Sequence, residues 1–104
     1  MKTILLGLNE LNFEYIKFYS NKGLLPNFKN IFTNYKIVET KSEDKYELLE
    51  PWIQWATVHT GKSFNEHQIF RLGDIVNSNE EQLFESIESR GFSVGAVSPF
   101  NAKN

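Results

Sequence analysis

Three short apolar runs, each bounded by turn residues, constrain the possible folds of this chain most. They are KTILLGL at 2–8, YKIVET at 35–40 and FSVGAVS at 92–98. The first and the last are mostly apolar, as in strands that are buried on both faces. The middle run alternates and is rich in β-branched residues, which also favours a strand. We therefore expect three strands.

Helix signals lie between these runs. Asn12 can cap a helix that stops near Gly23, and Pro26 suits the first turn of a second helix over 26–34. Strands that are separated by helices predict an α/β protein with a mostly parallel sheet flanked by helices. Ligands of such sheets gather at the carboxyl ends of the strands. That edge is where a functional site is expected.

Two more helices are expected further along the chain. The pattern over 52–60 indicates a helix, and Ser78 with Glu81 has the spacing of a capping box before another one. The stretches 41–50 and 62–77 show no clear period. We expect both to be loops on the surface.

The segment PWIQWATVHTGKS at 51–63 allows two interpretations. Its end fits the relaxed A-x-x-x-x-G-K-S form of a phosphate-binding P-loop. A P-loop, however, follows an apolar strand, and Pro51 and Gln54 are unlike residues of a central strand. We therefore expect Gly61 to end a helix and Lys62 to be a solvated charge.

Composition excludes several classes of function. The net charge of −2 and the lack of a Lys/Arg cluster give no reason to expect nucleic acid. The absence of Cys excludes disulfides, thiolate metal sites and a Cys nucleophile, and fits a reducing compartment. The first apolar run is too short for a signal-peptide core or a bilayer span. We expect a soluble, cytoplasmic protein without a membrane span.

Four segments, in this order, resemble the N-terminal part of the alkaline phosphatase superfamily, which includes sulfatases, nucleotide phosphodiesterases and phosphoglycerol transferases. The segments are LLGLNELN at 5–12, GLLPNFKNIF at 23–32, ATVHTGKSFNEHQIF at 56–70 and ESRGFSVGAVS at 88–98. The third is similar to the T-G-x-x-P-x-x-H-G signature, with Thr60, Gly61 and His67 in register. Phe64 and Gln68 replace its Pro and second Gly.

The resemblance implies a metal-dependent hydrolase or transferase that acts on phosphate or sulfate esters. It also implies two divalent ions, Zn²⁺ or Mn²⁺, and a nucleophile at a helix N-terminus, where backbone amides hold an anion. Residues 1–104 would then be the N-terminal part of a single, truncated α/β domain. Since further Asp and His ligands come from the C-terminal half in this superfamily, we expect the chain alone to be inactive.

The candidate site residues follow from the resemblance and its departures. The nucleophile position falls on Pro51, which cannot attack, so the adjacent Glu50 is the candidate catalytic carboxylate. The metal-binding Asp corresponds to Asn9, and Glu10 after it is a second candidate metal ligand.

Other residues have weaker assignments. Trp52 and Gln54 are candidate substrate contacts, with core packing and a surface amide as the alternatives. His67 is expected to shape its loop. Two other functions stay open: a non-catalytic superfamily member that binds an anionic ligand, and a small α/β interaction domain.

Overall fold

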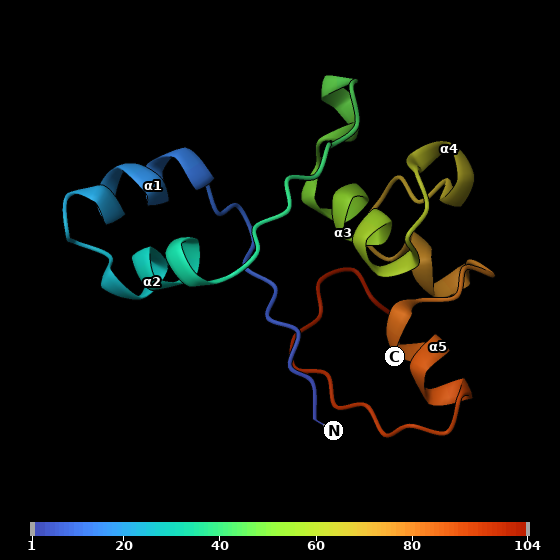
Figure 1. The fold of residues 1–104 in the computed structure, drawn as a ribbon. Coiled ribbons are helices and arrows are strands. Elements are labelled where there is room, and N and C mark those ends of the chain that lie inside the picture. Colours follow the sequence, from blue (N-terminus) through green and yellow to red (C-terminus); the bar gives the residue numbers. More distant parts are fainter. Residues whose placement is uncertain (1, 104) are drawn as a thin grey trace. The chain divides into compact units, whose positions relative to one another are not determined.

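The computed structural model describes residues 2–103, which form helices joined by irregular segments (Figure 1). The chain divides into two compact units, residues 1–40 and residues 41–104, and each is described by itself. The elements in chain order are α1 (Phe13–Asn21), α2 (Pro26–Asn34), the 3₁₀ helix η1 (Tyr46–Leu48), α3 (Pro51–Thr60), α4 (Phe64–His67), the 3₁₀ helix η2 (Asp74–Asn77) and α5 (Leu83–Ser89).

The expected parallel sheet is wrong for the described residues, because 2–103 contain helices but no strand. The three apolar runs are irregular and pair with no neighbour. A strand is stable only where its backbone groups bond to another strand and its side chains are covered. In the first run Ile4 is 91% exposed, and in the last run Val97 is 95% exposed. The α/β class and the alkaline-phosphatase-like core are therefore corrected to a helical fold.

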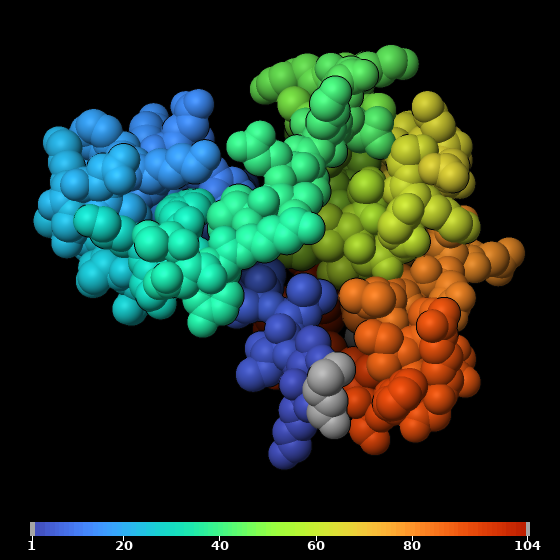
Figure 2. Space-filling model, in the orientation of Figure 1, coloured from blue at the N-terminus to red at the C-terminus, as the bar shows by residue number. Residues whose placement is uncertain are grey.

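The N-terminal apolar run lies on the surface of its unit, as Figure 2 shows for the dark-blue segment. Leu5 and Leu6 are about three-quarters exposed, at 76% and 75%. The apolar pattern was identified correctly, but a pattern within one segment does not say what covers it. The run thus has the composition of a buried strand without the burial.

Residues 1–40 form a helical hairpin whose helices begin where the sequence predicts. Asn12 caps α1, because its Oδ1 accepts hydrogen bonds from the amides of Glu14 and Tyr15 at 2.9 and 3.1 Å. Pro26 occupies the first turn of α2, and the predicted bounds of this helix are confirmed. The rings of Phe13 and Phe32 meet edge to face, 6.0 Å apart, and join α1 to α2.

Residues 41–104 pack around α3. Its buried side includes Ile53 and Ala56, both fully inaccessible, and Ala56 lies in a core cluster with Ile69 and Ile75. The stretch 62–77 is therefore not the surface loop that its lack of period predicted. It contains α4 and η2 and contributes core residues.

The N-cap residue of helix α5 lies four residues after the expected one. The capping box consists of Gln82 and Glu85, not of Ser78 and Glu81. Ser78 instead ends η2, where its Oγ donates to the carbonyl of Ile75 at 2.9 Å. Both pairs have the same three-residue spacing, and the pattern favours Ser78 because Gln is not one of the preferred N-cap residues.

Helices in the described part of the chain are at most ten residues long. Within residues 2–103, none of them could cross a membrane. The expectation of no membrane span agrees with this finding.

Candidate functional site

The predicted site residues are divided between the two units. Asn9 and Glu10 belong to residues 1–40, whereas Glu50, Trp52 and Gln54 belong to residues 41–104. Asn9 and Glu10 are exposed in a turn, and Glu10 has a φ of +56°, in the left-handed region that few non-glycine residues adopt. Their placement in an exposed turn leaves the Glu10 carboxylate accessible to solvent.

Glu50 is the N-cap residue of α3. Its backbone carbonyl accepts hydrogen bonds from the amides of Ile53 and Gln54, at 2.9 and 3.0 Å. Its side chain makes no capping bond and is exposed, so the carboxylate stands at the positive end of the helix dipole. Pro51 follows at the first helical position and has no N–H. The first turn of α3 therefore has one donor fewer for binding an anion.

Trp52 and Gln54, the predicted substrate contacts, both take part in contacts that hold the fold. The Gln54 Nε2 donates to the carbonyl of Leu48 at 2.7 Å and joins α3 to η1. The carbonyl of Trp52 accepts from the Nδ2 of Asn101 at 2.6 Å. Both side chains are partly exposed, and a substrate contact stays a prediction for each of them.

Metal ligands are too sparse among the described residues for the expected centre. Within residues 2–103, no group of three or more His, Cys, Asp or Glu side chains lies close enough together to hold a metal ion. A dinuclear site needs several such ligands around each ion. Asn9, Glu10 and Glu50 are thus single candidates, and residues 2–103 do not fit a two-metal centre by themselves.

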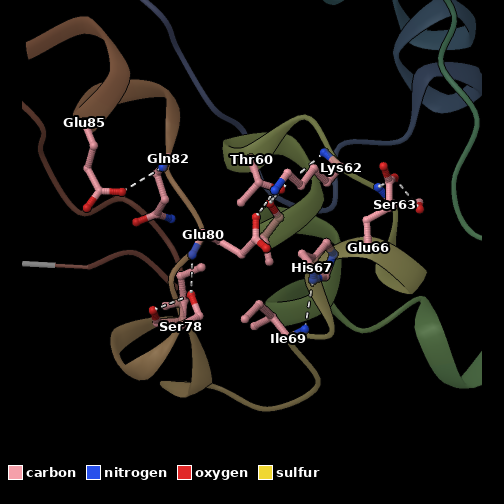
Figure 3. Close-up of polar contacts among 12 residues, drawn as sticks. Thr60, Lys62, Ser63, Glu66, His67, Ile69, Ser78, Glu80, Gln82 and Glu85 are labelled. Carbon is pink, nitrogen blue, oxygen red and sulfur yellow. Dashed lines mark hydrogen bonds and ion pairs between the residues drawn. The ribbon is translucent and has the colours of Figure 1, made fainter. Parts of the chain in front are cut away.

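The P-loop interpretation of 51–63 is wrong. Gly61 has a φ of +69° and ends helix α3, as the alternative predicted. Lys62 is exposed, as predicted, and it also pairs with Glu80, with 2.5 Å between its Nζ and the carboxylate Oε2 (Figure 3). This ion pair raises the pKa of Lys62. The lysine therefore already has an anionic partner within the chain.

The backbone amides after Lys62 are also occupied by carboxylates. Ser63 donates from its amide and its Oγ to Glu66 Oε2, at 2.8 and 2.7 Å, which completes the capping box of α4. These hydrogen bonds lower the pKa of Glu66. The amide of Phe64 donates to Glu43 Oε1 at 2.7 Å. A phosphate would have to displace two carboxylates here.

His67 and Thr57 lie in contact between α4 and α3. The His67 Nε2 is 3.0 Å from the Thr57 Oγ1, and the amide of Ile69 donates to the His67 Nδ1 at 2.9 Å. Because Nδ1 accepts, a neutral ring has its proton on Nε2 and donates it to Thr57. Burial lowers the pKa of His67, which keeps the ring neutral. His67 therefore holds α4 against α3, in agreement with its expected loop-shaping role.

A second buried histidine belongs to a polar network near α5. The Gln82 Oε1 accepts from the amide of Lys103 at 2.8 Å, so its Nε2 is the donor that faces His59 Nδ1, 3.4 Å away. Burial lowers the pKa of His59, and a hydrogen bond with the backbone of Asn101 opposes this shift. Both histidines thus have structural partners.

Asn101 connects the C-terminal segment to the rest of its unit. It is buried, its Oδ1 accepts from the amide of Gly73 at 3.0 Å, and its Nδ2 donates to Trp52. Sequence reasoning did not single out Asn101 or the fully buried Gln82. Their partners lie more than 20 residues away along the chain, and no local pattern records such a pairing.

A small hollow of about 250 Å³ lies between the end of α3 and the beginning of α5. His59, Gly61, Glu81 and Gln82 are among its lining residues. Its titratable groups are His59, which burial keeps neutral, and the carboxylate of Glu81. These groups do not favour an anionic ligand at this position.

Comparison with known proteins found no match among family models, curated proteins or solved structures. The relationship to the alkaline phosphatase superfamily therefore stays a prediction that rests on the four sequence segments.

Proposed function

We propose that this chain is part of a protein that acts on phosphate or sulfate esters as a hydrolase or a transferase. The observation that carries the proposal is that the segment 56–70 turns back on itself. Gly61 ends α3 in a left-handed turn, and His67 returns to within 3.0 Å of Thr57. This is the segment that resembles the superfamily signature, whose fixed spacing from Thr60 to His67 suits such a closed turn.

Glu50 is the candidate catalytic residue within this function. Its carboxylate is exposed at the start of α3, next to the position at which the superfamily has its nucleophile. An exposed carboxylate can accept a proton from an attacking water or hydroxyl. Trp52 and Gln54, in the same turn of α3, are the candidate substrate contacts.

A divalent-ion site in this function needs ligands in addition to those that residues 2–103 bring together. Asn9 and Glu10 offer an amide oxygen and a carboxylate, which are oxygen ligands of the kind that Zn²⁺ and Mn²⁺ accept. The described residues do not complete a site around either of them. We therefore assign no reaction step to a metal.

The substrate is proposed to be a small molecule and the location the cytoplasm. A net charge of −2 argues against nucleic acid as the partner. The absence of Cys from the sequence is in keeping with a reducing compartment.

A second candidate function is non-catalytic binding of an anionic ligand. It is favoured by Pro51, which stands at the nucleophile position and has no group that can attack an ester. The α/β interaction domain is not retained, since the described residues form no sheet.

The complete gene product can be tested with 4-nitrophenyl phosphate, bis-4-nitrophenyl phosphate and 4-nitrophenyl sulfate. Each is assayed with Zn²⁺, with Mn²⁺ and with EDTA. Turnover that EDTA abolishes is expected with at least one ester. Glu50→Gln is expected to lower kcat/KM by about 100-fold, as when a ligand-supporting or proton-accepting carboxylate is removed.

The matched control is Glu47→Gln, which makes the same change at an exposed position three residues before Glu50. This variant is expected to keep the wild-type kcat/KM. Equal activity of Glu50→Gln and Glu47→Gln contradicts the role of Glu50. Saturable binding of the esters without any turnover favours the non-catalytic function instead.

A further inference from the structure

The unit of residues 1–40 contains a hollow of about 570 Å³ between α1 and α2, here named the α1–α2 pocket. This volume is within the range of pockets that bind small organic molecules, roughly 300–1,000 Å³. Its lining residues include Lys17, Ser20, Asn21, Lys29, Phe32 and Ile37. All of them belong to one unit, so the pocket is complete within residues 1–40.

Ser20 is the unusual residue of the α1–α2 pocket. It is only 2% exposed, and its Oγ has no hydrogen-bond partner in the described part of the chain. A helical serine or threonine ordinarily bonds to a backbone carbonyl one turn earlier. Thr33 on the pocket's other helix does so, since its Oγ1 donates to the carbonyl of Lys29 at 2.8 Å. The Oγ has almost no accessible surface, so an acceptor atom in the pocket would reach it only after a change of the Ser20 rotamer. Because a buried hydroxyl without a partner is unfavourable, that contact would stabilise Ser20.

The charge of the pocket is opposite to that of the whole chain. Two lysines and one glutamate line it, 2 − 1 = +1, whereas the chain has a net charge of −2. The Lys17 Nζ is 4.0 Å from the carboxylate of Glu39, and both side chains are at least half exposed. A pair of this kind is weak in water, so Lys17 can turn to a stronger anion. Lys29 has no ion pair within residues 2–103.

The remaining wall of the pocket is apolar and consists of Phe32 and Ile37. Cationic groups, an unpaired hydroxyl donor and an aromatic ring in one hollow match a ligand with an anionic head and an apolar body. We propose that the α1–α2 pocket binds a small organic phosphate or sulfate, with the head at Lys17, Lys29 and Ser20. The inference uses residues 1–40 only and holds whether or not the protein turns over esters.

Phenylphosphonate is the appropriate probe, because its carbon–phosphorus bond is not hydrolysed. The full chain, labelled with ¹⁵N, is titrated and its backbone amide signals are followed. Saturable shifts are expected at residues 17–21 and 29–39, with a Kd of about 1 mM or tighter. Inorganic phosphate and benzyl alcohol, which each supply half of the ligand, are expected to bind at least about five-fold more weakly.

Variants test the two lysines and the serine of the α1–α2 pocket separately. Lys17→Met/Lys29→Met is expected to weaken phenylphosphonate binding by at least about ten-fold, a loss typical of charged hydrogen bonds. Ser20→Ala is expected to weaken it by about five-fold while leaving the thermal midpoint unchanged or higher, because the unpaired hydroxyl is removed. The control, Lys36→Met, alters an exposed lysine of the same unit that does not line the pocket, and should change Kd by less than about two-fold.

Two outcomes would overturn the inference. One is the absence of saturable shifts at about 10 mM phenylphosphonate, which corresponds to binding too weak for a built site. The other is an equal loss of affinity per lysine in Lys36→Met and in the pocket variant, which would show that only net charge matters. Helical circular dichroism of each variant verifies that α1 and α2 are still formed.

Discussion

His67 donates a hydrogen bond to Thr57 rather than accepting one from it. The His67 Nε2 lies 3.0 Å from the Thr57 Oγ1, and the Nδ1 on the other side of the ring is already an acceptor for the amide of Ile69. In a nucleophile–base pair the imidazole has to take the hydroxyl proton. The neighbouring Thr and His are therefore a structural bond between α3 and α4, not a catalytic pair.

Replacing Thr57 by Val should destabilise the unit of residues 41–104. The change leaves the buried Nε2–H of His67 without an acceptor, which costs roughly 1–3 kcal/mol. Trp52 and Trp55 both lie in α3, so the fluorescence change in urea reports the unfolding of this unit. Thr57→Ser keeps the hydroxyl and should keep most of the stability. An unchanged urea midpoint for Thr57→Val would show that the contact contributes nothing.

The stability of residues 41–104 should decrease as the pH falls through 6.5. Burial lowers the pKa of both His59 and His67 from the ordinary value of 6.5, so the unfolded chain binds more protons than the folded one below that pH. Unfolding free energy therefore falls as the solution is acidified, and the two histidines add no pH dependence above about pH 7.5. The pKa of Glu66 is also lowered, so protonation of this carboxyl reduces the unfolding free energy further, but only below its ordinary pKa of 4.5. Urea midpoints measured across this range check the direction.

The lowered pKa of each histidine can also be measured directly. In an NMR titration of the histidine Hε1 signals, both rings should titrate below 6.5, the ordinary value. A midpoint at or above that value for either ring contradicts its burial as a neutral group.

Asn101 should be among the most sensitive positions of its unit. Asn101→Ala removes the acceptor for the Gly73 amide and the donor for the Trp52 carbonyl, which together cost roughly 2–4 kcal/mol. Asn101 has a φ of +47°, so Asn101→Gly separates backbone strain from the lost bonds. Both variants should lower the urea midpoint, whereas Asn79→Ala, at an exposed position, should not. If Asn101→Gly leaves the urea midpoint unchanged, the loss of stability in Asn101→Ala comes from backbone conformation alone.

The chain should not bind nucleoside triphosphates through its G-K-S sequence. The Lys62 ammonium is paired with Glu80, and the amides of Ser63 and Phe64 donate to carboxylates. Fluorescence anisotropy of a labelled ATP with Mg²⁺ should therefore be the same with the wild-type protein and with Lys62→Met. Binding that Lys62→Met abolishes would restore the P-loop interpretation.

The helices could be predicted because their signals are local. Asn12, Pro26 and Gly61 each act within one turn of the chain, through a capping hydrogen bond, a fixed φ and a left-handed conformation respectively. Each of them is found in the predicted role. The start of α5 was misplaced, since Ser78 and Glu81 fit the usual capping pattern, whereas the box is formed four residues later by Gln82 and Glu85.

The sheet and the polar network could not be predicted because both depend on distant partners. The apolar run at 2–8 specifies a surface that prefers burial but not the strand that would pair with it, and in the structure the run is irregular and exposed. Conversely, Gln82 and Asn101 resemble surface amides in the sequence and are buried by contacts with His59, Gly73 and Trp52. Ser20 was overlooked for the same reason, since one serine in a helix does not reveal that its hydroxyl is enclosed.

Amide hydrogen exchange of the full chain tests the helical fold, on which the sites described above depend, most directly. The amides of Ile4, Leu5 and Leu6 are expected to exchange at the rates of an unfolded peptide, while those in the middle of α3 are protected. Strong protection of residues 3–6, together with cross-strand contacts to residues 36–38 or 92–96, would establish a sheet and contradict this account.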